Sequence, residues 1–169
     1  MNIETELEKE HSRTQTDKIV SYVGYDNVRF EELMTVVLAN KKGIAQRAAW
    51  SMAIIALQHP MLFVPYLGRI LMLIQQKNVH DSLIRNSLKT FEAIEIPENC
   101  QGEIVELCLK MLLEPSKPVA IKAFAISTLQ NICRQHPELA IEVKLILKER
   151  IEFEKPAFIS RAKRFLKEF

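Results

Sequence analysis

Glycine is scarce in this sequence, with only four in 169 residues. Glycine supplies the left-handed backbone of tight hairpin turns and the close approach needed in phosphate-binding loops. No glycine-rich phosphate loop and no Gly-x-Ser-x-Gly motif is present. The β-branched residues lie among Ala, Leu, Lys and Glu rather than in alternating runs. The sequence therefore predicts an all-α fold and shows no catalytic constellation, so neither a lyase nor a glycosylase activity is expected.

Cysteine is also scarce, and its number is odd. Cys100, Cys108 and Cys133 lie inside apolar helical patterns, without a Cys-x-x-Cys pair. The four histidines are scattered and form no His-x-x-x-His pair. We therefore expect no metal and no other cofactor. Unpaired thiols in apolar helices favour a cytoplasmic protein with reduced, structural cysteines.

Long apolar runs are missing as well. The most apolar stretch, residues 61–74, is interrupted by Pro65, Gly68 and Arg69, and it is shorter than the roughly 20 residues that span a bilayer. The first ten residues are too acidic and polar for a secretory signal. No membrane partner is expected.

A strong charge of one sign is absent too. The 23 basic and 21 acidic side chains leave a net charge of +2, which disfavours an obligate nucleic-acid binder. Apolar residues make up 48% of the chain, so a chain of this length is able to bury a substantial core.

Apolar residues at helical spacing are present along most of the sequence. Residues 1–16 are predicted to form a short surface helix or a loose arm, and Asp17 is predicted to cap a helix over residues 18–25. Asp26 is predicted to cap the next helix. The further helices are expected over residues 28–39, 44–58, 60–76 with a bend near Pro65, 83–94, 98–137 as a helix–turn–helix, 137–153 and 157–169.

A repeat is the main signal. Four basic residues are spaced by 38, 37 and 39 residues, and a short residue follows each; the pairs are Arg47-Ala48, Arg85-Asn86, Lys122-Ala123 and Arg161-Ala162. Prolines recur with a similar step. A period near 40 in helix pairs is typical of a solenoid. We expect four pairs over residues 27–59, 60–97, 98–136 and 137–169, with residues 1–26 as an N-terminal arm and cap helix.

Two segments carry a family resemblance. Val-Ala-Ile-Lys-Ala-Phe-Ala-Ile-Ser-Thr-Leu-Gln-Asn-Ile, which begins at Val119, resembles the second helix of a HEAT-like repeat, and Ile-Ala-Gln-Arg-Ala-Ala-Trp-Ser-Met-Ala, which begins at Ile44, is similar to it. The resemblance covers about residues 27–169 and implies a right-handed α-α superhelix of about four HEAT-like pairs. An Asp usually lies about six positions before the basic residue in this family. Those positions here hold Lys41, Val79, Ser116 and Lys155, which leaves the family's Asp–Arg ladder in doubt.

Trp50 bears on the alternative function. HEAT-like proteins include DNA-alkylation-repair glycosylases, which use aromatic residues and an acidic residue in a basic groove; this distant similarity implies nucleic-acid binding as the alternative. Trp50 has no Asp nearby in sequence and lies in an apolar helix, so we interpret it as a core residue. The basic repeat positions are interpreted as structural, bonded to carbonyls at helix ends or to carboxylates.

The function expected from these patterns is a non-catalytic scaffold that binds another protein. Polar residues on the second helices, together with the basic last helix, form the predicted partner-binding stripe. Its members are Arg85, Asn86, Lys89, Gln130, Asn131, Arg134, Arg161 and Arg164.

Overall fold

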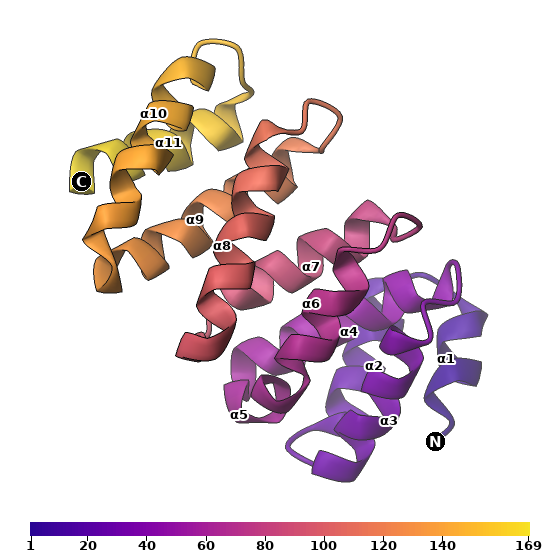
Figure 1. The fold of residues 1–169 in the computed structure, drawn as a ribbon. Helices are drawn as coiled ribbons and strands as arrows, with labels where there is room; N and C mark the ends of the chain where they lie inside the picture. Colours follow the sequence, from indigo (N-terminus) through magenta and orange to yellow (C-terminus); the bar gives the residue numbers. More distant parts are fainter. The chain divides into compact units, whose positions relative to one another are not determined.

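The computed structural model describes all of residues 1–169 and contains α-helices, two short 3-10 helices and no β-strand (Figure 1). The all-α prediction is confirmed. The chain forms two compact units, Met1–Thr90 and Phe91–Phe169. Each unit is described by itself.

The first unit is built around α4, which packs against three earlier helices. Its helices are α1 (Ile3–Lys9), α2 (Arg13–Val23), α3 (Asn27–Leu38), α4 (Ile44–Gln58), α5 (Pro60–Phe63), η1 (Val64–Tyr66), α6 (Leu67–Ile74) and α7 (Asp81–Phe91), whose last residue opens the second unit. Because Ala45, Ala48, Ala49 and Ala53 have short side chains and are at most 1% exposed, α4 fits closely among α1, α2 and α3.

The helix boundaries follow the expected caps in most places. Asp26 accepts hydrogen bonds from the backbone N–H groups of Val28 and Arg29, at 2.9 and 3.1 Å, and so caps α3 as predicted. Gly43, with φ of +82°, precedes α4, and a 3-10 turn around Pro65 produces the predicted bend between α5 and α6.

The predicted start of α2 was wrong. The helix begins at Arg13, and the Ser12 hydroxyl caps it by accepting a hydrogen bond from the Gln15 backbone N–H at 3.0 Å. Asp17 lies within the helix, where its carboxylate pairs with Arg13 one turn earlier at 2.8 Å. A Ser with a Gln three residues later is a capping-box pattern, and it competes successfully with Asp17 for the start of the helix.

Residues 1–16 include a docked helix rather than a loose arm. Ile3 and Leu7 of α1 are only 3% and 2% exposed, and α1 contacts α2, α3 and α4. The two apolar residues lie four positions apart and therefore face the same side of α1. Burial of this face fixes α1 on its neighbours.

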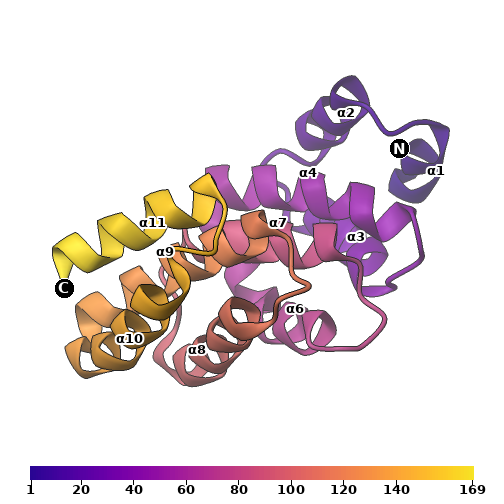
Figure 2. The same cartoon turned by 90° about the horizontal axis from the view of Figure 1, so that it is seen from above.

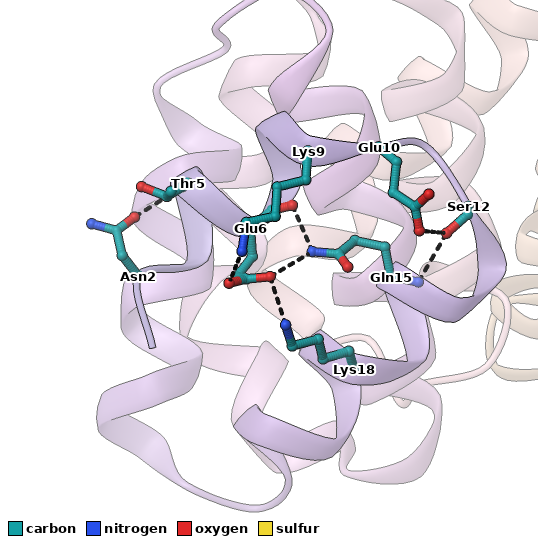
Figure 3. A network of polar contacts seen from close by, with 8 residues as sticks. All are labelled: Asn2, Thr5, Glu6, Lys9, Glu10, Ser12, Gln15 and Lys18. Carbon is teal, nitrogen blue, oxygen red and sulfur yellow. Dashed lines mark hydrogen bonds and ion pairs between the residues drawn. The ribbon is translucent and has the colours of Figure 1, made fainter.

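A polar network around Glu6 joins α1 to α2 (Figure 3). The Glu6 carboxylate accepts hydrogen bonds from Lys18 at 2.8 Å, from Lys9 at 2.7 Å and from the side-chain amide of Gln15 at 2.9 Å. These three donors, with Lys18 contributing most, lower the pKa of Glu6 to about 2. Glu6 therefore stays ionised and bonded to α2 throughout the neutral and mildly acidic range.

The second unit has two layers of helices. Its elements are α8 (Glu98–Leu113), α9 (Val119–Gln135), η2 (Pro137–Leu139), α10 (Ala140–Arg150) and α11 (Pro156–Glu168). Figure 2 shows α8 and α10 on one side and α9 and α11 on the other, in agreement with the close packing of α9 against both α8 and α11. Phe158 and Phe165 of α11 are fully buried and anchor this helix.

The repeated short residue has a common environment. Ala48, Asn86, Ala123 and Ala162 are 0%, 4%, 7% and 0% exposed. Each follows the basic residue of its helix, so the repeat read from the sequence reports a recurring close-packed position.

Candidate functional site

Three of the four basic repeat residues make contacts within the chain. Arg47 on α4 donates a hydrogen bond to the backbone carbonyl of Leu7, at 2.6 Å, near the end of α1. Lys122 on α9 pairs with a carboxylate, and Arg161 on α11 binds a hydroxyl and a carboxylate. Arg85 on α7 is exposed. The contacts of these three residues agree with the structural role that was predicted for the basic repeat positions.

Lys122 forms a buried ion pair in the second unit. Its ammonium lies 2.7 Å from a carboxylate oxygen of Glu154, and the two side chains are 4% and 10% exposed. Arg150 donates to the same oxygen at 2.8 Å. Burial alone would raise the pKa of Glu154, but the hydrogen bonds from Lys122 and Arg150 outweigh it and hold the pKa below the ordinary value. The pair ties α9 to the turn between α10 and α11.

Five of the predicted partner-binding residues lie in one polar network on α9 and α11. Arg134 binds the Glu168 carboxylate with two nitrogens, Nε at 2.5 Å and Nη2 at 2.9 Å. The Gln130 side-chain amide also donates to Glu168. Arg164 donates to the Gln130 side-chain oxygen at 3.2 Å and to the Ser127 hydroxyl at 3.1 Å. These bonds hold the C-terminal half of α11 on α9.

The same network continues to the residue that follows α7. Arg161 donates to the Ser127 hydroxyl at 2.5 Å and lies 3.4 Å from a carboxylate oxygen of Glu92. Asn131 donates to the backbone carbonyl of Glu92 at 2.7 Å and accepts a hydrogen bond from Arg134 at 2.9 Å. The predicted stripe on α9 and α11 is thus brought together, but most of its hydrogen-bonding groups have intramolecular partners.

The three predicted residues on α7 differ in exposure. Arg85 is exposed and Lys89 is half-buried, whereas Asn86 is only 4% exposed. The expectation that Asn86 contacts a partner at the surface was wrong. Asn86 occupies the close-packed position that Ala48, Ala123 and Ala162 hold in the other second helices.

Trp50 is not a core residue, contrary to the interpretation from its sequence context. Its side chain is half-buried, and the ring meets the edge of the His11 ring with a centroid separation of 5.9 Å. His11 lies in the connection between α1 and α2. This connection covers one side of Trp50, and the apolar composition of α4 gave no indication of that partial cover.

The second unit contains a groove that was not predicted from the sequence. It has a volume of about 470 Å³ and lies between one face of α8 and the segment that runs from the end of α9 into α10. Its lining residues are Glu98, Gln101, Gly102, Val105, Glu106, Leu109, Ile132, His136, Glu138, Leu139 and Glu142. The six residues from α8 follow helical spacing. The spacing of these six residues on α8 was visible in the sequence. That they line a groove depends on the residues after α9, which the sequence of α8 does not indicate.

Hydrogen bonds organise one wall of this groove. Gln101, only 7% exposed, donates to the backbone carbonyl of Ile96 at 3.0 Å and to the Gln135 side chain at 3.1 Å. The Nε2 atom of the His136 ring lies 2.8 Å from the side-chain oxygen of Gln101. The Nδ1 atom of the same ring lies 3.8 Å from a carboxylate oxygen of Glu138. These contacts join the start of α8 to the end of α9 and fix the groove wall.

The family follows from a comparison with known protein families. A model of the HEAT repeat domain matches residues 3–169. The chain belongs to this family. No curated protein and no solved structure matches the chain. The predicted fold class, an all-α HEAT repeat solenoid, is thereby confirmed, and the match reaches further toward the N-terminus than the predicted residues 27–169.

The HEAT assignment gives the buried ion pair a structural context. The expected Asp is missing at the position six residues before Arg161, yet Glu154, one residue earlier, pairs with Lys122 of the preceding helix pair. A carboxylate therefore links successive HEAT helix pairs here from a shifted position. The polar cluster of α9 and α11 adds further links between the second helices of the same two pairs.

Two further observations concern the chemistry that this HEAT repeat chain carries. No group of three or more His, Cys, Asp or Glu side chains is arranged to hold a metal ion. None of the helices combines the length and the apolar character needed to cross a membrane.

Proposed function

We propose that this HEAT repeat protein is a non-catalytic scaffold that binds another protein, and that the outer face of α10 with the adjacent groove contacts the partner. The proposal is carried by large apolar side chains on that face: Ile141 and Leu145 are 68% and 60% exposed. They lie four residues apart and share one side of the helix. Neighbouring exposed apolar side chains rimmed by polar residues are typical of protein-binding surfaces.

The opposite face of α10 supports this proposal. Ala140, Val143 and Leu147 are at most 4% exposed and dock the helix on the second unit. One apolar face is sufficient for that docking. The second apolar face has no role in the packing of this unit, so a partner accounts for it better than folding does.

The state of the thiols supports the proposed cytoplasmic location. Cys108 and Cys133 are buried, and all three cysteines are free. Burial raises the pKa of Cys108 far above its ordinary value and that of Cys133 to about 11. Such thiols remain protonated and unreactive at neutral pH, as structural cysteines of a reducing compartment do.

The test compares partners retained by the wild-type chain and by the double variant Ile141→Glu, Leu145→Glu. The matched control is Val28→Glu, Met72→Glu, because these side chains are equally exposed, at 67% and 65%, on the first unit. We expect a specific protein to be retained by wild type and control and lost by the α10 variant, with unchanged melting temperatures. Equal retention by all three chains, or turnover in a substrate screen, would contradict the proposal.

Nucleic-acid binding is the second candidate, and one observation favours it. Lys155, Lys163, Arg164 and Lys167 are exposed on or next to α11, and such a basic helix face attracts phosphates. Fluorescence polarisation with a short DNA duplex at low and moderate salt tests it. Binding that falls steeply with salt and is lost in Lys163→Glu, Lys167→Glu supports this function, and no binding at low salt removes it.

A further inference from the structure

The groove between α8 and the start of α10 has an acidic rim. Its lining includes four carboxylates but neither Lys nor Arg; these are Glu98, Glu106, Glu138 and Glu142. The single ionic contact among them is the 3.8 Å approach of His136 to Glu138. A concave surface lined by charges of one sign concentrates the field and selects a partner of the opposite sign. The rim therefore selects a cationic partner.

The floor of the groove is apolar. Val105 and Leu109 of α8 line it together with Ile132 and Leu139. The lining residues of α8 extend from Glu98 to Leu109, which corresponds to about 16 Å or three helical turns. An apolar strip of this length between charged edges has the dimensions of a site for an amphipathic helix, which places side chains at i, i+3 or i+4, and i+7 into such a groove.

Gly102 gives a second, independent indication. It lies inside α8, is exposed and lines the groove. A Cβ atom added at this position meets no other atom within 4 Å, and the residue does not have a positive φ. The fold has no use for glycine here, and glycine weakens a helix interior relative to alanine. A glycine on a groove wall does, however, permit the close approach of another backbone.

We propose that this groove binds a basic amphipathic helix of a partner protein, with its apolar side on the Val105–Leu109 strip and its Lys or Arg side chains on the four glutamates. The inference rests on the proposed scaffold function and specifies the chemistry of the partner. A second copy of this chain fits less well. Its basic helix, α11, already buries Phe158 and Phe165 in its own unit and has no free apolar side of that size.

The experiment uses the full chain and a fluorescein-labelled 14-residue peptide with Leu on one helical face and Lys on the other. A peptide with Glu in place of Lys, and a scrambled peptide of the same Leu/Lys composition, are the peptide controls. Fluorescence polarisation measures the Kd of each. We expect binding of the Leu/Lys helix alone, weakened by salt.

Three variants locate the binding. Glu106→Gln, Glu142→Gln should weaken binding by about 2- to 30-fold, because it removes two rim charges. The matched control Glu149→Gln, Glu152→Gln removes two exposed carboxylates outside the groove and should leave the Kd unchanged. Gly102→Leu should weaken binding at least tenfold by filling the groove, while its melting temperature is maintained or raised, because a Cβ added here meets no other atom within 4 Å and leucine favours the helix more than glycine does.

Either of two results overturns the inference: equal effects of the two glutamine double variants, or binding of the scrambled or acidic peptide as tightly as the Leu/Lys helix. The scaffold function is judged separately. A cellular partner that is lost with Ile141→Glu, Leu145→Glu but kept with Gly102→Leu means that the groove proposal fails and the scaffold stands. If no partner depends on either variant, the scaffold function itself fails.

Discussion

Replacement of Glu154 by glutamine should destabilise the second unit strongly. The change keeps the size of the side chain but removes its charge. The Lys122 ammonium, 2.7 Å away on a side chain that is 4% exposed, then lacks its counter-charge in a place that water hardly reaches. Loss of one partner of a buried ion pair typically costs 3–5 kcal/mol. Because the glutamine oxygen still accepts a hydrogen bond, we expect the lower end, about 3 kcal/mol.

Urea unfolding followed by circular dichroism measures this loss. The melting temperature should fall by about 6–12 °C, since 1 kcal/mol corresponds to about 2–4 °C in a chain of this size. Glu149→Gln, which changes an exposed glutamate of α10 five residues before Glu154, is the control and should change the unfolding free energy by less than about 0.5 kcal/mol. Adding Lys122→Met to Glu154→Gln removes the unpaired charge and should restore most of the stability.

The pH dependence provides a second readout of the same pair. The pKa of Glu154 is lowered in the folded chain, so its stabilising contribution is present above the ordinary glutamate pKa of about 4.3. It is lost as the pH falls through the lower, folded value. The wild-type unfolding free energy should therefore decrease more steeply below pH 5 than that of Glu154→Gln. Two results would refute the reasoning. One is an unfolding free energy of Glu154→Gln within about 0.5 kcal/mol of the wild-type value. The other is a double variant, Lys122→Met with Glu154→Gln, that is no more stable than Glu154→Gln alone.

Three more predictions concern other sites. Glu6→Gln should speed hydrogen exchange of the α1 amides, because it weakens the bonds to Lys18 and Lys9. In the wild-type chain the same loosening of α1 should occur only as the pH approaches about 2, the pKa of Glu6 in the folded chain. Equal exchange rates in both chains at neutral pH would contradict this prediction. Ala123→Leu should destabilise the chain by about 1–3 kcal/mol through overpacking, and an unchanged thermal melt would mean that this position is not closely packed. Gly102→Ala should stabilise folding by about 0.5–1 kcal/mol; Gly68→Ala, also in open space, is the companion variant, and a lower melting temperature for Gly102→Ala would show that the fold requires this glycine.

Local signals in the sequence predicted the helices well. Apolar spacing and prolines located α3, α4 and the bend at Pro65, because these features act within one or two turns of chain. The start of α2 was missed because two side chains, Ser12 and Asp17, are both good N-caps. The tertiary surroundings, with Gln15 bonded to Glu6 of α1, favour the earlier start.

The candidate sites depended on contacts between distant residues, and the sequence predicted them less well. The five stripe residues of α9 and α11 do lie together, but Glu168, which binds Arg134 and Gln130, is 34 residues from Arg134 and gave no signal of its own. Asn86 reads as polar and exposed on a helical wheel, yet its side chain is only 4% exposed in the folded chain. The groove requires α8 and the start of α10 to face each other, and periodicity within one helix carries no such information.

The two apolar faces of α10 have a genetic consequence. A library of α10 substitutions selected only for a folded chain should be restrictive at Ala140, Val143 and Leu147 and permissive at Ile141 and Leu145. The same library selected for retention of the proposed partner should become restrictive at all five positions. Sequence drift on this helix would then reveal two separate selective pressures, one from the fold and one from the partner, which alternate along eight consecutive residues.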